Sequence, residues 1–120
     1  MRKSGAQLDS EIAAKLKSTD VGIKKLWAWL PKLNETIVDV NEGRRSYRSG
    51  DPLRVSRLDS PRGAYFIIDG HHRAVEAILA GRSTVAVEID PHVPRIEHAG
   101  NAYQSYIENK VNAFDFLKRR

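Results

Sequence analysis

The chain is organised around one stretch, Ala64-Tyr65-Phe66-Ile67-Ile68-Asp69-Gly70-His71-His72-Arg73-Ala74-Val75-Glu76-Ala77-Ile78. Its first five residues form a continuous apolar run, which is typical of a buried strand, and the residues after Arg73 have helical spacing. The Asp-Gly pair between the two parts is a turn signal. The stretch therefore predicts a strand, a turn and a helix in direct succession.

The turn is a candidate phosphate site. At the carboxyl end of a strand and the amino end of a helix, free backbone N–H groups meet the positive end of the helix dipole, so anions bind readily. Gly70 allows a close approach of the backbone to a ligand, while His71, His72 and Arg73 supply side-chain donors suited to phosphate. We therefore expect these four residues to bind phosphate.

Other interpretations of the same residues remain open. His71 could merely cap the helix while Asp69 ends the strand, and Arg73 could form an ion pair with Glu76 one turn later. Adjacent histidines point to different sides of a helix start, so chelation of one zinc ion by both is disfavoured. A histidine, with an ordinary pKa near 6.5, could also act as a general acid or base.

Composition limits the possible classes of protein. A chain of 120 residues is expected to form a single domain, 1–120, and its 41% hydrophobic and 29% charged residues are ordinary for a globular protein. The sequence contains no cysteine, which excludes disulfides and thiolate metal sites. We find no membrane-length apolar run and no hydrophobic secretory leader, so no membrane partner is expected. The net charge of +5 favours an anionic partner, with simple solubility as the alternative.

The expected order of elements is α+β. Hydrophobic spacing predicts a helix over residues 7–17, a second helix from Asp20 to Pro31 and a strand over 36–40. Next come strands at 53–58 and 64–68 joined by the 59–63 turn, a helix ending at Gly81, a strand at 85–89 and a helix from about 103 to 117. Within these helices we expect Val75, Ile78 and Leu79 to point inward, and Trp27 and Trp29 to lie on different faces as packing residues. The sequence thus predicts a small mixed β-sheet packed on helices, with a core at about 35–90, an N-terminal helical pair and a C-terminal helix.

The longest loop-like segment, residues 41–52, is a second functional candidate. It carries Arg44, Arg45 and Arg48, with the acidic residue Glu42 at its start and Asp39 just before it. Loops of this length in compact domains are often functional. The alternative is a solvated connection.

Between the expected strand and helix stands the motif Ile68-Asp69-Gly70-His71-His72-Arg73, and Gly81 and the Val85–Val87 strand follow it. This pattern resembles that of the ParB/sulfiredoxin-like superfamily. The resemblance covers about residues 52–90, is weaker over 35–51 and is absent from the first 34 and last 30 residues. It implies nucleotide binding, with the phosphates in the turn. Members of this superfamily hydrolyse CTP, use ATP to repair oxidised peroxiredoxin or phosphorylate free serine with ADP, and others are described as nucleases.

Departures from the superfamily pattern reduce the number of activities that the resemblance allows. Sulfiredoxins need a cysteine where this chain has His71, so that activity is excluded. Partitioning proteins continue into a helix-turn-helix domain, whereas only one helix is expected here after the last strand. The spelling is closest to the free-serine kinases, whose upstream catalytic acid has no clear counterpart; Asp39 and Glu42 are the nearest candidates.

These observations lead to a phosphoryl-transfer hypothesis. The turn at 70–73 would hold the phosphates of ATP, ADP or CTP, and Asp69 would help to hold Mg²⁺. Arg44, Arg45 or Arg48 would neutralise developing charge, Glu42 or Asp39 would orient the attacking group, and His71 or His72 would move a proton.

The alternative is a nuclease or nucleic-acid-binding module that uses the arginine loop and the basic carboxyl end. Such a small basic module could be the toxic domain of a secreted bacterial toxin, neutralised by an immunity protein. We accordingly expect action in the bacterial cytoplasm, or in a target cell after secretion.

Overall fold

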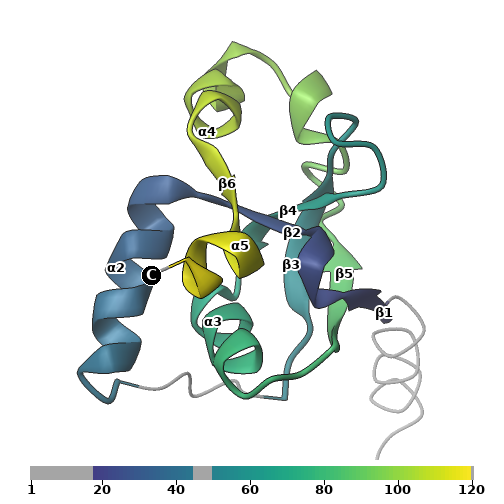
Figure 1. Cartoon of the computed structure of the whole chain (residues 1–120). Helices are drawn as coiled ribbons and strands as arrows, with labels where there is room; N and C mark the ends of the chain where they lie inside the picture. The colour runs from purple at the N-terminus through teal and green to yellow at the C-terminus, as the bar shows by residue number, and fades with distance from the viewer. Residues whose placement is uncertain (1–17, 45–49, 120) are drawn as a thin grey trace, which may run out of the picture.

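The computed structural model describes residues 18–44 and 50–119, which form a mixed sheet with helices packed against it (Figure 1). The fold class is α+β, as expected. In chain order the elements are β1 (Ser18–Gly22), η1 (Ile23–Lys25), β2 (Leu26–Trp29), α2 (Leu30–Asn41), β3 (Leu53–Arg57), β4 (Tyr65–Asp69), α3 (His71–Leu79), β5 (Thr84–Ile89), η2 (Ile96–His98), η3 (Asn101–Tyr103), α4 (Gln104–Glu108), β6 (Lys110–Asn112) and α5 (Ala113–Lys118).

The six strands lie in the order β1-β5-β3-β4-β2-β6. The neighbouring strands β4 and β2 are parallel, with Leu26 opposite Tyr65 and Trp27 opposite Phe66. Both strands therefore end at the same edge of the sheet, and each passes at once into a helix, β2 into α2 and β4 into α3. The fold thus brings two strand-to-helix junctions together, although they lie 40 residues apart in the sequence.

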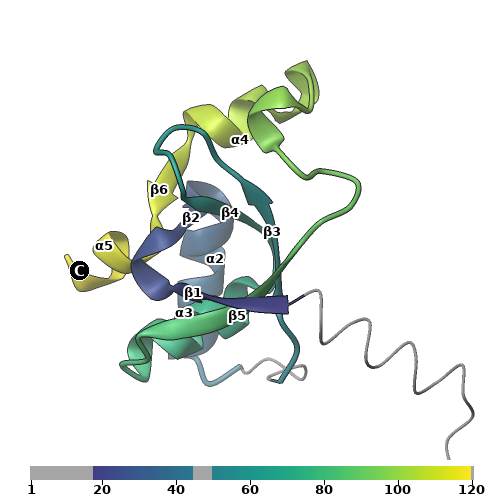
Figure 2. The same ribbon diagram turned by 90° about the vertical axis from the view of Figure 1, so that its right-hand side faces the viewer.

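Side chains of the sheet alternate between two apolar layers, as the two-residue period of a strand requires. Leu26 and Ile67 face the main core with helices α2 and α3, whereas Trp27 and Phe66 face a smaller cluster that includes Ile96. Figures 1 and 2 show α2 and α3 on one side of the sheet and the segment that leads through α4 to β6 at one end.

The expected strands at 53–58, 64–68 and 85–89 are confirmed as β3, β4 and β5, and the 59–63 turn joins β3 and β4 as an antiparallel pair. Helix α3 buries Val75 and Ile78 as expected. Leu79 was wrongly placed in the core, because its side chain is 58% exposed. Gly81 follows the helix end with a left-handed φ of +76°.

Two predictions for residues 20–40 were wrong. The expected helix after Asp20 is instead β1, η1 and β2, and the expected strand at 36–40 lies within α2. Pro31 stands in the first turn of α2, where its missing N–H costs nothing, and Leu33 and Ile37 bury one helical face.

Two further predictions need correction, and others fall outside the described residues. Trp27 and Trp29 lie on one face of β2, both half-buried. The expected long C-terminal helix is broken into η3, α4, β6 and α5, because the segment 110–112 pairs with β2. The expected helix at 7–17 and the residues Arg45 and Arg48 lie outside the described residues. Within the described part of the chain, no helix is long and apolar enough to cross a membrane.

Candidate functional site

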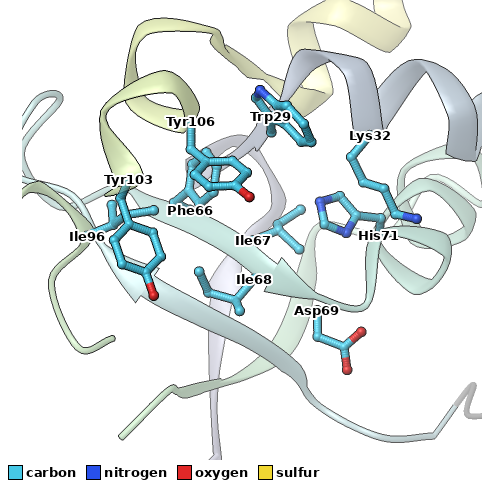
Figure 3. A pocket seen from close by; sticks show the side chains of 10 residues that line it. All are labelled: Trp29, Lys32, Phe66, Ile67, Ile68, Asp69, His71, Ile96, Tyr103 and Tyr106. Atoms are coloured by element: carbon cyan, nitrogen blue, oxygen red, sulfur yellow. The ribbon is translucent and has the colours of Figure 1, made fainter. Parts of the chain in front are cut away.

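A cavity of about 300 Å³ lies where the two strand-to-helix junctions meet (Figure 3). In open α/β arrangements, ligands commonly bind outside the carboxyl ends of parallel strands. Trp29 and Lys32 line the cavity from the end of β2 and the first turn of α2, while Asp69 and His71 line it from the end of β4 and the first turn of α3. The other lining residues are Phe66, Ile67, Ile68, Ile96, Tyr103 and Tyr106. We call this cavity the His71 pocket.

Groups that can bind an anion gather at one end of the His71 pocket. Helices α2 and α3 both begin there, so their positive dipole ends and free N–H groups lie near the cavity. Lys32 adds an ammonium group (Figure 3). A phosphate or carboxylate at this end would meet several donors at once.

The expected site residue His71 also lies at this end of the pocket. Its side chain is more than nine-tenths buried, with a relative exposure of 8%, and its Nε2 atom has no hydrogen-bond partner among the described residues. Burial, with Lys32 nearby as the next cause, lowers the pKa of His71 to about 4, so the imidazole is neutral near pH 7. A buried nitrogen without a partner that lines a cavity is poised to bond to a ligand.

The opposite end of the pocket is aromatic. Trp29 and Tyr106 meet edge to face with their ring centroids 4.8 Å apart, and Tyr103 lies 6.0 Å from Tyr106. Figure 3 shows Tyr103 and Tyr106 on the side of the cavity away from Lys32 and His71, with Trp29 between them and Lys32. Aromatic rings that line a cavity offer stacking and edge contacts to a planar group.

The side chains of His71, His72 and Arg73, which we call the histidine turn, lie in three different environments. His71 lines the pocket, whereas His72 turns to α2, where its Nε2 atom lies 3.2 Å from Asp39 Oδ2. Asp39 also accepts hydrogen bonds from Arg44 at 3.0 and 2.6 Å, and the same guanidinium lies 2.5 Å from a carboxylate oxygen of Glu42. The hydrogen bonds from Arg44 are the main reason why the pKa of Asp39 is lowered.

The third environment is that of Arg73. Its guanidinium packs against Gly70 and lies 3.4 Å from the carbonyl of Pro52, and it lines a different hollow, between Gly50, Ala77 and Arg82. Gly70 has a left-handed φ of +102°, and a Cβ atom there would lie 2.6 Å from Arg73 Nη2. The glycine therefore makes room for Arg73 in this structure.

The expected site residues are thus only partly brought together. Asp69 and His71 share the pocket, and His72 joins the ion-pair cluster of Asp39, Glu42 and Arg44. None of the four residues of that cluster lines the His71 pocket. Asp69 is an exposed carboxylate at its mouth, and the described residues contain no group of three or more metal-ligating side chains.

Sequence reasoning missed Lys32, Tyr103 and Tyr106 as site residues and treated Trp29 as a packing residue. These residues come from segments far from the histidine turn, and only the parallel pairing of β2 with β4 and the return of the chain through α4 place them beside it. No local motif marks them.

Comparison of the chain with family models, with curated proteins and with solved structures finds no match.

Proposed function

We propose that this chain binds a nucleoside di- or triphosphate in the His71 pocket and transfers or hydrolyses its terminal phosphoryl group. One observation carries the proposal. An imidazole nitrogen that is buried and has no partner among the described residues lies with a lysine at one end of a cavity whose other end is aromatic. Phosphates fit the first end and a base fits the second. The similarity of Asp69–Arg73 to the phosphate turn of the ParB/sulfiredoxin-like superfamily supports the same ligand.

His71 has two uses in this scheme. With its proton on Nε2, the imidazole donates a hydrogen bond to a phosphate oxygen; with its proton on Nδ1, Nε2 accepts a proton from the attacking hydroxyl or water. In the second case the attacking oxygen bonds to the terminal phosphorus, the bond from phosphorus to the bridging oxygen breaks, and the proton passes to Nε2. A bound polyanion favours the charged imidazolium, so it makes His71 a stronger base than in the free chain.

The carboxylate of Asp69 fits a role in holding Mg²⁺. This ion usually takes one or two protein carboxylates and fills its other positions with phosphate oxygens and water, so a larger ligand cluster is not needed. When bound, Mg²⁺ would neutralise charge on the phosphates.

Calorimetry tests the binding step. ATP, ADP, CTP and GTP would each be titrated with Mg²⁺ into wild type, Lys32→Gln and Lys25→Gln. Lys25 is an exposed lysine outside the pocket, so its variant controls for loss of one charge. We expect wild type to bind at least one nucleotide, Lys32→Gln to bind it about tenfold or more weakly, and Lys25→Gln to match wild type, since a hydrogen bond to a charged group contributes about 1.5–3 kcal/mol. No binding by wild type, or equal affinity in all three chains, would refute the site.

Phosphate release with the bound nucleotide, and with candidate hydroxyl acceptors, tests the chemical step. His71→Gln keeps a side chain that can donate a hydrogen bond but cannot take up a proton at this position. We expect it to bind nucleotide and to lose turnover by roughly 100-fold or more, the usual contribution of a positioned base. Unchanged turnover in this variant would remove His71 from the chemistry.

A further inference from the structure

A second surface combines cations with aromatic rings, at the β6 edge of the sheet. The ammonium groups of Lys24 and Lys118 lie 5.3 and 5.4 Å from the centre of the Phe114 ring, and that of Lys110 lies 5.7 Å from the centre of a Trp27 ring. Attraction to the ring faces holds such cations in place. Figures 1 and 2 both show α5 beside β6 at this edge.

These residues surround the β6 edge of the sheet, where Trp27 packs on the smaller apolar cluster and Phe114 packs on the main core. A groove of about 410 Å³ is lined by Trp27, Lys110 and Arg119, and also by Asn112. The side-chain amide of Asn112 donates a hydrogen bond of 2.7 Å to the carbonyl of Lys24, which places η1 next to the groove. We define the basic–aromatic face as Lys24, Trp27, Lys110, Phe114, Lys118 and Arg119.

The positive charge of this face is not neutralised within the described chain. Among the described residues, no carboxylate lies within ion-pair distance of Lys24, Lys110 or Lys118, although Asp115 is close by on the groove wall. In contrast, Arg44, Arg54 and Arg95, elsewhere on the molecule, each pair with a carboxylate. Unpaired cations gathered at one groove favour a polyanionic partner.

We propose that the basic–aromatic face binds single-stranded nucleic acid, with the lysines on the phosphates and the half-buried rings of Trp27 and Phe114 beside the bases. Grooves that combine cations with aromatic side chains bind single strands because every base has a face that can stack. A duplex hides its base faces. An anionic membrane would call for exposed apolar side chains, whereas the large apolar side chains that are exposed in the described chain, Val38 and Leu79, lie on α2 and α3.

The face is separate from the nucleotide site. The groove at β6 and the His71 pocket share no lining residue, and Trp27 and Trp29, two positions apart, line one each. The inference therefore does not rest on the proposed function, and either can fail without the other.

Three binding measurements test the proposal. Fluorescence anisotropy measures binding to a labelled 20-nucleotide oligo(dT) and to a labelled duplex of the same length, and a third assay measures binding to vesicles of mixed neutral and anionic lipid. The double variant Lys24→Gln/Lys118→Gln is compared with Arg62→Gln/Arg82→Gln, which removes the same charge from exposed positions outside the face. We expect the first variant to bind oligo(dT) about tenfold or more weakly than wild type, and the second to bind it within about twofold, since phosphate contacts carry most of the affinity. Lys32→Gln, which alters the His71 pocket, should bind like wild type.

Salt gives an independent check. If four cations contact phosphates, the slope of log affinity against log salt is about −3 for a single strand, so a rise from 50 to 200 mM salt weakens binding roughly 50-fold. Absence of binding at 50 mM salt, equal losses in the two double variants, or tighter binding to the duplex or the vesicles than to oligo(dT) would each overturn the proposal.

Discussion

At the scale of single residues, the histidine turn shows that neighbours in sequence need not share a site. His71, His72 and Arg73 leave one helical turn in three directions, toward the pocket, α2 and Pro52. A helix start separates successive side chains by about 100°. We assign His71 to the ligand because it lines the pocket and its buried Nε2 atom has no hydrogen-bond partner among the described residues.

Gly70 gives a prediction about stability. Gly70→Ala forces an L side chain to a φ of +102° and brings its Cβ within 2.7 Å of Leu53 and 2.6 Å of Arg73. We expect a loss of roughly 2–5 kcal/mol in the free energy of unfolding, from backbone strain and overpacking together. Gly81→Ala is the matched control, since Gly81 has a φ of +76° with open space around it, and it should cost only about 1–2 kcal/mol. Urea denaturation measures both, and equal losses would show that the packing of Arg73 and Leu53 does not matter.

His71 gives a prediction about pH. The folded-state pKa of about 4 lies below the ordinary value of 6.5, so between these values the unfolded chain binds a proton that the folded chain does not. Stability is therefore full above about pH 6.5 and falls as the pH is lowered toward 4, by up to about 3 kcal/mol.

Denaturation of wild type and His71→Gln between pH 4 and 7.5 tests this assignment. His71→Gln should be less sensitive to pH in this window, while His92→Gln, at an exposed position, should follow wild type. The pKa values of Asp39 and Asp59 are lowered from their usual 3.8, so these two carboxyls affect stability in a lower pH range than His71 does. A wild-type pH profile that persists in His71→Gln would assign the dependence to other groups.

At the scale of elements, α5 depends on its N-cap residue, Asn112. The side-chain oxygen of Asn112 accepts a hydrogen bond from the Asp115 backbone N–H at 3.0 Å, and its amide donates to the carbonyl of Lys24. Asn112→Ala removes both bonds and should cost about 1–2 kcal/mol, whereas Asn112→Asp keeps the cap and should cost less. Thermal unfolding compares the two, and an Asn112→Asp variant as unstable as Asn112→Ala would assign the main role to the bond with Lys24.

How far sequence predicted these elements depends on where their stabilising contacts lie. The strand at 65–69 and helix α3 carry their own signals, an apolar run, an Asp-Gly turn and helical spacing, and they were predicted closely. Residues 23–29 also fit helical spacing, yet they form η1 and β2, because β4 and β6 pair with β2 from far along the chain. The candidate site shows the same limit: Asp69 and His71 were identified locally, whereas Lys32 and Tyr106 needed the sheet order. Long-range pairing overrides local preference in such segments.

At the scale of the whole molecule, the His71 pocket joins parts of the chain that are distant in sequence. Its walls come from the β2–α2 junction, the β4–α3 junction and the segment that carries η3 and α4. A nucleotide that spans the pocket would therefore stabilise these segments together. A ligand that binds only the folded state makes every local opening that breaks its contacts less favourable.

Hydrogen exchange can separate the two ends of the pocket. With the nucleotide that binds best, we expect slower exchange in the first turns of α2 and α3 and also in the segment 101–108, where Tyr103 and Tyr106 lie. Inorganic phosphate, which has no base, should protect the two first turns and leave 101–108 unchanged. Strand β1, at the far edge of the sheet, reports the general stabilisation against which local protection is judged. Nucleotide protection that stops at α2 and α3 would remove the aromatic end from the binding site, and protection equal to that of β1 in all segments would mean that the ligand binds elsewhere.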